Sequence, residues 1–310
     1  EKMTKTKPAD PSNRVGSLGG SDIANILGIG FGTPLETYEQ TLGIAPSSEM
    51  SDRMKWGHLL EDPIAKEYAE VTGKKVARVN RTLEHSDHPF LTAHLDRRIV
   101  GESAILEIKT TNVFASEWGE TGTDQVPDRY QVQIAHYMNI TRTERADVAV
   151  LIGGQELRLF SVERNERLID ICQEAAVKFW RDHIEKQVPP DPATNAECSK
   201  AYSKHTIGRT IALSGDLLQN LQALERVKED QKHLKKQRDL CEHSIKLQMT
   251  DAEAIEQDGR AVATWTNQTS RRLDTKALKE AHPDIYEEFL RETVSRTFRL
   301  KTKFIKELTG

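Results

Sequence analysis

The chain contains 310 residues, and its 44 Lys and Arg residues stand against 48 Asp and Glu residues, so the formal net charge is −4. This length is enough for one large domain or two ordinary ones. The charge balance excludes a strongly basic class such as histones or ribosomal proteins, but a nucleic-acid enzyme stays open because a basic groove needs only local charge. No apolar run approaches the roughly 18 residues of a membrane-spanning helix, and no signal-peptide core is present.

Three cysteines, Cys172, Cys198 and Cys241, lie far apart in the sequence. This spacing fits neither a disulfide framework nor a CxxC metal site. We therefore expect a soluble protein of a reducing cytoplasm, with no membrane partner. The first methionine is Met3, where we expect the natural chain to start.

The first part of the chain alternates helical and strand patterns, which predicts an α+β or mixed α/β fold with helices flanking one small sheet. Ser21 is expected to cap a short helix, and Thr33-Pro34-x-Glu36 is a capping pattern that begins a second helix. Gly153-Gly154 is typical of a tight hairpin turn between two strands. Further helices are expected over residues 51–72, 127–140 and 165–186, and strands over 74–79, 91–95, 97–100, 104–109, 146–152 and 156–162.

The proline-rich segment Pro189-Pro190-Asp191-Pro192 blocks continuation of the preceding helix and marks a boundary. From Ser214 to about Gln257 an apolar stripe runs among many charges, which predicts a long amphipathic helix, or a helical hairpin broken near Thr250. A strand over 261–266, a helix over 274–290 and a basic strand over 297–302 are expected to follow. We therefore expect a core domain over 1–190, a linker over 191–213 and a C-terminal extension of long helix and β structure over 214–310.

The stretch that is most informative for chemistry ends at Lys109. Glu107 and Lys109 are two residues apart on an apolar strand, so their side chains share one face, and Asp96 can lie beside them. Two carboxylates on one face, with the main-chain carbonyl of Ile108, suit a hard divalent cation. A neighbouring lysine can orient or activate a water near a phosphate, so the pattern predicts metal-assisted hydrolysis of a phosphodiester.

A [DE]-x-K pattern is weak alone, because it also occurs at Asp230–Lys232 and Asp274–Lys276. Those two lie in helical patterns, where residues i and i+2 point in different directions. For Glu107 and Lys109, an ordinary ion pair at the end of a strand remains the alternative.

Two predicted helices add candidate side chains to this strand. Glu61, in the helix expected over 51–72, can face the metal directly or through water; the alternative is a solvated carboxylate. Gln133 and Tyr137 lie at i and i+4 on one face of the helix expected over 127–140. For them the alternative is a surface glutamine and a tyrosine at the edge of the core.

The order of these motifs, a helical Glu, a strand Asp, Glu-x-Lys and a helical Gln-x-x-x-Tyr, resembles the PD-(D/E)XK nuclease superfamily over about residues 13–185. The chain resembles the phage recombination branch, the YqaJ-type viral recombinases and lambda exonuclease, because Arg14 precedes Ser21 by seven residues as in the opening motif of that branch. The proline usual in the "PD" element is absent, since Leu95 precedes Asp96. The region after Pro192 resembles the tail of YqaJ-type proteins and has no counterpart in lambda exonuclease.

The resemblance implies a restriction-endonuclease-like core with a small central mixed sheet, and it assigns roles to ten residues. His94 stands where lambda exonuclease has a small hydroxyl residue, and it is a candidate for DNA contact. The implied set is Asp96, Glu107 and Ile108 for the metal, Lys109, Glu61, Gln133 and Tyr137 for catalysis, and Arg14, Ser21 and His94 for the 5′-phosphate and DNA.

The resemblance further implies a Mg²⁺-dependent 5′-to-3′ exonuclease, with Mn²⁺ able to substitute, that degrades one strand of linear double-stranded DNA and leaves 3′ overhangs for recombination by annealing. A homotrimer around DNA, a phage single-strand annealing protein as partner, and a phage or prophage origin in the bacterial cytoplasm are implied as well. Two alternatives stay open. One is a PD-(D/E)XK endonuclease or single-strand nuclease, and the other is a catalytically inactive DNA-binding or assembly module.

Three other features allow competing interpretations. The glycines between Gly16 and Gly32 do not follow a hydrophobic strand, which argues against a dinucleotide-binding loop. We expect instead that they let the backbone approach a phosphate at the start of a helix. His233, Cys241 and His243 lack the paired spacing of a zinc site. The alternation of apolar and basic residues around Arg299 suits either phosphate binding or a charged edge strand.

Overall fold

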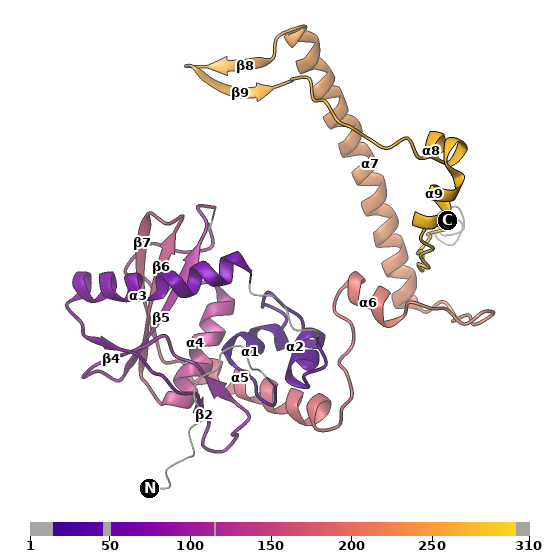
Figure 1. The fold of residues 1–310 in the computed structure, drawn as a ribbon. Coiled ribbons are helices and arrows are strands. Elements are labelled where there is room, and N and C mark those ends of the chain that lie inside the picture. Colours follow the sequence, from indigo (N-terminus) through magenta and orange to yellow (C-terminus); the bar gives the residue numbers. More distant parts are fainter. Residues whose placement is uncertain (1–14, 46–50, 115, 302–310) are drawn as a thin grey trace. The chain divides into compact units, whose positions relative to one another are not determined.

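The computed structural model describes residues 15–45, 51–114 and 116–301. The chain divides into two compact units, Glu1–Cys198 and Ser199–Gly310, which are described here one at a time (Figure 1). The division falls within the segment 191–213 that we expected to be a linker. That segment contains a helix, α6 (Asn195–Ala201), so part of it is regular structure.

A five-stranded mixed sheet forms the centre of the first unit. Its strand order is β1-β4-β5-β6-β7, in which β5 and β6 are parallel and the other neighbours are antiparallel. The strands are β1 (Val76–Ala77), β4 (Arg97–Ile99), β5 (Ala104–Thr111), β6 (Arg145–Ile152) and β7 (Glu156–Glu163). This is the small mixed sheet of the expected α/β fold. A short pair, β2 (Leu83–Glu84) and β3 (Thr92–Ala93), forms a separate sheet, and β2 was not predicted.

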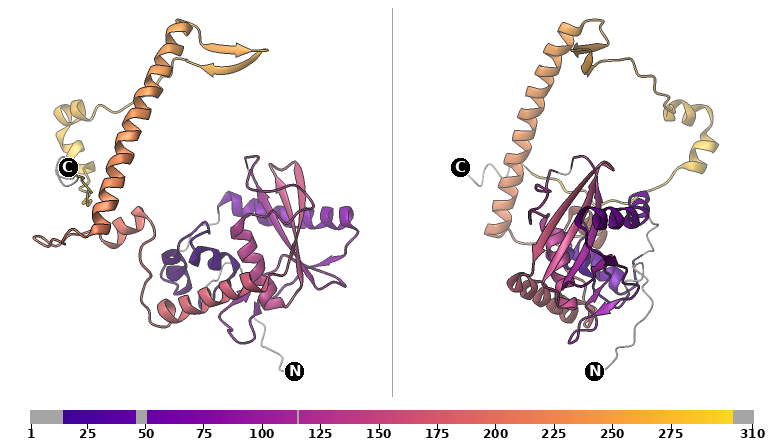
Figure 2. Two further views of the ribbon diagram at one scale, coloured as in Figure 1. Left: turned by 180° about the vertical axis from the view of Figure 1, so that it is seen from behind. Right: turned by 90° about the vertical axis from the view of Figure 1, so that its left-hand side faces the viewer.

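Helices cover both faces of the sheet (Figure 2). The parallel pair β5 and β6 is connected through α4, as a parallel crossover requires. The helices of this unit are α1 (Gly20–Ile26), α2 (Pro34–Thr41), α3 (Asp52–Thr72), α4 (Asp128–Thr141) and α5 (Glu166–Phe179), the last continuing into a π-helical turn, η1 (Trp180–Ile184).

The alternation of β5 divides its side chains between two cores. Leu106 and Ile108 pack in one core with Tyr68 of α3. Ile105 packs in the other core with Ile134 of α4. Because successive strand residues point to opposite faces, Glu107 and Lys109 share the face of Ile105 and project toward α4.

The helix boundaries follow from local chemistry. Ser51 caps α3 by accepting from the Met54 N–H at 3.3 Å, and α3 ends at Gly73, whose φ of 71° is the left-handed conformation that glycine adopts without strain. The expectation that Ser21 caps the first helix is wrong. Gly19 is the capping position, because the Asp22 carboxylate reaches back and accepts from the Gly19 N–H at 2.8 Å, and Ser21 lies inside the first turn.

The second unit contains one long helix, α7 (Gly215–Met249), followed by a hairpin of β8 (Ala254–Gln257) and β9 (Arg260–Thr264) (Figure 1). The helix that we expected to reach Gln257 therefore ends eight residues earlier, at Met249. The last four residues of the predicted helix, Ala254–Gln257, form β8 instead. The helix expected over 274–290 is two helices, α8 (Thr275–Ala281) and α9 (Pro283–Phe289), since a proline cannot continue the first one.

The prediction of a basic strand over 297–302 is also wrong. The structure describes residues 297–301 of this segment, and they pair with no strand. Alternating apolar and basic residues form a strand only where a partner strand supplies the hydrogen bonds. Nearby, the Arg296 guanidinium donates to the carbonyl of Tyr202 at 3.3 Å. Among the described helices, none is both long and apolar enough to cross a membrane.

Candidate functional site

A cavity of about 680 Å³ in the first unit collects most of the predicted site residues. It is enclosed by α1, α3, α4, β5 and the segment before β4. Arg14 lies outside the described residues. The other nine predicted residues line the cavity: Ser21, Glu61, His94, Asp96, Glu107, Ile108, Lys109, Gln133 and Tyr137.

Asp96 is fixed against β5 by a main-chain hydrogen bond. The antiparallel pairing of β4 with β5 ends at the pair Arg97 and Leu106, so Asp96 has no paired residue on β5. The Ile108 N–H, two residues beyond, donates instead to Asp96 Oδ2 at 2.7 Å. This bond brings the Asp96 carboxylate alongside the site of Glu107. Burial, and then the nearby Glu107 charge, raise the pKa of Asp96 well above its usual range.

Glu107 is buried and is held from two sides through the same oxygen. The Lys109 ammonium lies 2.6 Å from Glu107 Oε1, and the Gln133 amide donates to that atom at 2.9 Å. The amide also donates to the Tyr137 hydroxyl at 3.0 Å. The predicted face of α4 is therefore directed at the predicted face of β5, and neither glutamine nor tyrosine is a plain surface residue.

The charges in the cavity are coupled. Burial alone would lower the pKa of Lys109, but the carboxylates of Glu107 and Asp96 outweigh burial and raise it. Lys109 is thus an ammonium donor rather than a neutral amine. Burial, and then the Glu107 charge, also raise the pKa of Tyr137, so its hydroxyl keeps its proton.

The donor set fits a hard divalent cation. Glu107 is buried and Asp96 is half-buried. Burial is the main cause of the raised pKa of Asp96, and repulsion from the Glu107 carboxylate adds to it. A divalent cation bound by both carboxylates would relieve that repulsion. Within residues 15–45, 51–114 and 116–301, no group of three or more His, Cys, Asp or Glu side chains is placed to hold a metal. The chain would therefore complete such a site with main-chain oxygens, of which the Ile108 carbonyl is the predicted one, and with water.

Glu61 lines the same cavity and is paired with an arginine, so its predicted place beside a metal stays a prediction. The buried guanidinium of Arg97 forms ion pairs with Glu61 and with Asp62 of α3, and it also donates to the main-chain carbonyl of Asp96. Sequence reasoning missed Arg97. The signal that could have revealed it is an arginine directly after Asp96 at an inward position of β4.

Other lining residues were also missed. Asp22 is a buried carboxylate in the first turn of α1. Phe31, Arg53, Arg129 and Tyr130 form an aromatic and cationic group in the same cavity. For Arg129 and Tyr130 the available signal was helical spacing, since they lie one turn before Gln133 on α4.

Three of the glycines near the N-terminus have packing roles, and the expectation that this segment brings its backbone close to phosphate stays a prediction. A Cβ at Gly20 would lie 2.6 Å from Gln133 Cγ and 2.8 Å from Tyr137 Cε1. The missing side chain of Gly20 lets α1 lie directly against Gln133, which contacts Glu107, and against Tyr137, which accepts from Gln133. Gly30 and Gly32 similarly pack against Asn25.

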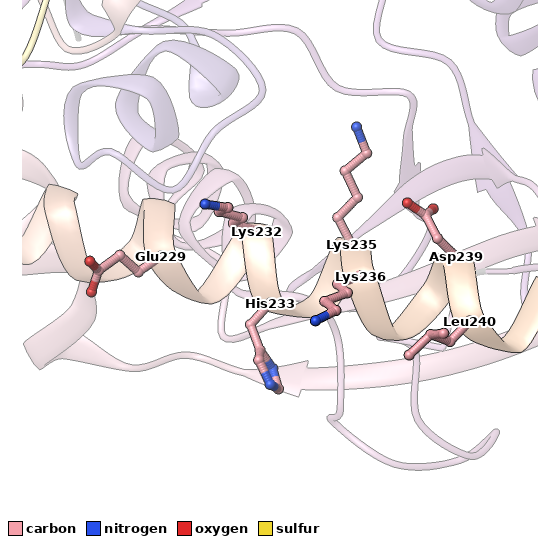
Figure 3. A pocket seen from close by; sticks show the side chains of 7 residues that line it. All are labelled: Glu229, Lys232, His233, Lys235, Lys236, Asp239 and Leu240. Atoms are coloured by element: carbon pink, nitrogen blue, oxygen red, sulfur yellow. The ribbon is translucent and has the colours of Figure 1, made fainter.

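A second hollow, of about 630 Å³, lies along α7 and contains His233 (Figure 3). All its lining residues come from this one helix, and Lys232, Lys235 and Lys236 make it largely basic. Cys241 is exposed on the same helix. No metal-binding cluster joins these residues in the part of the chain that is described, so a zinc site here has no structural support.

Comparisons with known proteins come from sequence families, from individual sequences and from solved structures. Residues 12–144 match the model of the YqaJ-like viral recombinase domain. The chain is 37% identical over 293 residues to the uncharacterized protein YqaJ of Bacillus subtilis strain 168, which covers 92% of this chain and 91% of that protein.

Two crystal structures are similar in part. An alkaline exonuclease, LHK-Exo, from Laribacter hongkongensis matches with 19% identity and a TM-score of 0.47, covering 56% of this chain and 91% of its own. A phage related exonuclease from Haemophilus somnus 129PT matches with 16% identity and a TM-score of 0.45, covering 55% of this chain and 96% of its own.

Proposed function

The chain belongs to the YqaJ-like viral recombinase family, and from this membership we propose that it is a magnesium-dependent deoxyribonuclease. The observation that supports the proposal best is the juxtaposition of Asp96, Glu107 and Lys109 in one cavity. The Ile108 N–H anchors Asp96, and β5 directs Glu107 and Lys109 to the same side. Two neighbouring carboxylates beside an ammonium are the groups that suit metal-assisted phosphodiester hydrolysis.

In this proposal each side chain has a separate task. Asp96 and Glu107 would hold one or two Mg²⁺ ions, with Mn²⁺ as a substitute. The chemistry supplied by the metal when bound is polarisation of the phosphate and stabilisation of the leaving oxygen. Lys109 orients or deprotonates the attacking water; its raised pKa favours orientation by a donated hydrogen bond. Gln133 and Tyr137 hold Glu107 in place, and Glu61 acts by holding Arg97.

We further propose the substrate and outcome that the family resemblance implies. The protein would degrade one strand of linear double-stranded DNA from its 5′ end and leave a 3′ overhang. A homotrimer around the DNA and a phage single-strand annealing protein as partner complete this picture, in the cytoplasm of a bacterial host. An endonuclease or single-strand nuclease, or an inactive binding module, remains the alternative outcome of the test.

The test is digestion of linear duplex DNA labelled at one 5′ end, next to closed circular duplex and single-stranded DNA. We expect release of the labelled nucleotide from the linear duplex with Mg²⁺, no release with EDTA, and an intact circle. Cutting of the circle indicates an endonuclease, and preference for the single strand indicates a single-strand nuclease. No release from any substrate indicates the inactive module.

Variants connect this activity to the cavity. Lys109→Ala should lower the rate by roughly 10²–10⁴-fold while DNA binding is mostly kept, since a proton-transfer or water-positioning role has that magnitude. Asp96→Asn and Glu107→Gln should each abolish turnover with Mg²⁺. A Lys109→Ala rate within tenfold of wild type would contradict the catalytic assignment.

Binding of the 5′-phosphate is tested separately. Ser21 offers a hydroxyl to the cavity, and Arg14 offers a guanidinium that can hold a terminal phosphate through two hydrogen bonds. The wild type should prefer 5′-phosphorylated over 5′-hydroxyl duplexes, and Arg14→Ala should lose most of that preference. Equal slowing of both substrates would place the phosphate pocket elsewhere.

A further inference from the structure

Phe31 is an exposed aromatic residue at the candidate active site. Its side chain is 73% exposed, although phenylalanine is ordinarily buried, and it lines the same cavity as Asp96, Glu107 and Lys109. A large apolar ring kept in water at the opening of a polar cavity costs free energy. Exposure alone would not indicate a ligand, since single exposed apolar side chains are common, but this ring lies in the cavity of the candidate active site.

The loop that presents Phe31 is built to hold it there. Gly28 has a φ of 76°, and the N–H groups of Ile29 and Gly30 both donate to the Ala24 carbonyl, at 3.0 and 2.9 Å. The Gly32 N–H donates to the Asn25 side-chain oxygen at 2.9 Å.

A glycine is sterically required directly before Phe31. A Cβ at Gly30 would lie 2.7 Å from Asn25 N, a backbone atom that cannot move aside. At Gly32 an added Cβ would meet only the side-chain ends of Asn25 and Glu36, each at 2.9 Å. The close packing at Gly30 and the hydrogen bonds to Ala24 and Asn25 therefore fix the loop, while the Phe31 side chain is exposed to solvent.

Cations surround the exposed ring. The centre of the Arg129 guanidinium lies 4.5 Å from the Phe31 ring centre, and that of Arg53 lies 5.8 Å away. Arg129 is itself positioned by an ion pair with Glu117. An apolar face between guanidiniums matches a nucleotide, because a base has a π-face to stack and the phosphates beside it are negative.

Tyr130 connects this group to the catalytic residues. Its ring packs edge-on against Phe31, with 6.4 Å between ring centres and an angle of 61° between ring planes. The Lys109 ammonium lies 5.0 Å from the centre of the same ring. A base stacked on Phe31 is therefore one aromatic ring away from the lysine of the proposed cleavage site.

We propose that Phe31, with Arg53, Arg129 and Tyr130, is a stacking platform for an unpaired nucleobase at the DNA end that is being digested. The platform positions the terminal nucleotide, and the two arginines contact its flanking phosphates. This inference rests on the proposed nuclease function, and the measurements below distinguish failure of the stacking platform from failure of the nuclease function.

The first measurement compares intact linear duplexes with duplexes whose 5′-terminal nucleotide is abasic. Phe31→Ala should lower kcat/KM on the intact duplex by at least about fivefold, the low end for loss of a stacking aromatic. On the abasic duplex, wild type and Phe31→Ala should be equal, since no base is there to stack. Phe31→Trp should keep the wild-type preference. Phe114→Ala is the matched control, because Phe114 is also exposed, at 85%, but does not line the cavity.

The second measurement does not require cleavage. A duplex with 2-aminopurine at the 5′ end is bound to protein that carries Asp96→Asn, and its fluorescence should be quenched by stacking. Adding Phe31→Ala should remove the quenching. If wild type digests DNA but Phe31→Ala behaves as wild type in both measurements, the platform is wrong and the nuclease function stands.

The remaining outcomes are also decisive. If wild type releases no nucleotide, the nuclease function fails, and the fluorescence alone decides whether the platform binds a base. If Phe31→Ala lowers the rate equally on intact and abasic duplexes and changes the molar mass of the protein in solution, Phe31 belongs to a protein interface and the proposal is overturned.

Discussion

Gln133 of α4 donates its amide to Glu107 Oε1 at 2.9 Å, the same oxygen that the Lys109 ammonium contacts at 2.6 Å. Glu107 Oε2 takes part in neither interaction. Two donors thus hold Glu107 Oε1, and by holding it they fix the orientation of the whole carboxylate, including Oε2. Gln133 therefore orients a proposed metal ligand from outside the metal site, as hydrogen-bonding partners of metal ligands commonly do.

Replacing Gln133 with Leu should lower activity by roughly 10- to 100-fold and raise the Mg²⁺ concentration needed for half-maximal rate, because loss of such a partner weakens metal affinity by that order. The measurement is the initial rate over a Mg²⁺ titration. Gln131→Leu is the matched control, since Gln131 lies on the same helix, donates its amide to the Val126 carbonyl just before that helix, and does not line the cavity. An unchanged Mg²⁺ requirement in Gln133→Leu would show that Gln133 does not orient the ligand.

Glu61 is expected to act through Arg97 rather than on a metal. Breaking its ion pair should destabilise the fold, because it leaves the buried Arg97 guanidinium with less compensation. Glu61→Gln should thus lower the urea midpoint of unfolding while the half-maximal Mg²⁺ concentration stays as in wild type. Glu107→Gln, by contrast, should abolish Mg²⁺-dependent activity with a smaller change in the midpoint. A large shift in the Mg²⁺ requirement of Glu61→Gln would return Glu61 to the metal site.

The sequence predicted the elements that local chemistry specifies. The capping pattern before α2 and the Gly153-Gly154 hairpin both appear where expected, and α3 begins one residue after its predicted start and ends at its predicted end. Period-two alternation placed Glu107 and Lys109 on one face of β5, and helical spacing placed Gln133 and Tyr137 together on α4.

What the sequence could not predict depends on contacts between distant segments. The pairing of Arg97 with Glu61 joins residues 36 positions apart, and no local pattern specifies it. Residues 297–301 have a strand pattern, but the described chain provides no partner strand for them. No local pattern indicates that Gly20 must be small, because the side chains it fits against, Gln133 and Tyr137, lie more than a hundred residues away.

His136 gives the fold a dependence on pH. It is fully buried, its Nε2 donates to the Thr92 carbonyl at 2.9 Å, and burial lowers its pKa to about 4. In the unfolded state this imidazole takes up a proton near pH 6.5, whereas in the folded state it does so only near pH 4. The free energy of unfolding therefore falls as the pH falls from about 6.5 to about 4, by roughly 3 kcal/mol in total.

Urea unfolding at several pH values tests this role of His136. The free energy of unfolding of wild type should fall below pH 6.5, and that of His136→Gln should fall less over the same interval, because glutamine can donate to Thr92 without titrating. His85 is a second histidine whose pKa is lowered, by burial and then by His88, so the informative quantity is the difference between the two proteins. A constant difference from pH 7 to pH 4 would contradict the assignment.

Removal of the second unit should separate chemistry from assembly. Every described residue that lines the cavity belongs to Glu1–Cys198, so a chain ending at residue 198 should still cleave linear DNA with Mg²⁺. The charged helix α7 and the following basic segment are lost, and we expect weaker assembly, DNA grip or binding to an annealing partner. The measurements are molar mass in solution, DNA affinity and the number of nucleotides released per binding event. A truncated chain equal to wild type in all of them would remove this role from residues 199–310.

At Gly20 we expect a Gly-to-Ala substitution to destabilise the protein, the reverse of its usual effect inside a helix. Replacing glycine by alanine inside a helix normally stabilises it by up to about 1 kcal/mol. At Gly20 the added Cβ would lie 2.6 Å from Gln133 Cγ and 3.2 Å from the Gln133 carbonyl oxygen, and backbone cannot move aside as a flexible side chain can. Gly20→Ala should therefore destabilise the protein by about 1–3 kcal/mol, the cost of overpacking a core.

Gly57 of α3 is the matched control, because its added Cβ would make only an ordinary contact, 3.8 Å from Thr110 Oγ1. Gly57→Ala should be neutral or slightly stabilising in the same urea titration. The displacement in Gly20→Ala falls on the residue that orients Glu107, so its activity should also fall, with a raised Mg²⁺ requirement like that of Gln133→Leu. The double variant Gly20→Ala/Gln133→Leu should then lose less activity than the sum of the two single effects, because both act through one contact. Full additivity would mean that the close packing of α1 on α4 supports the fold but does not orient the site.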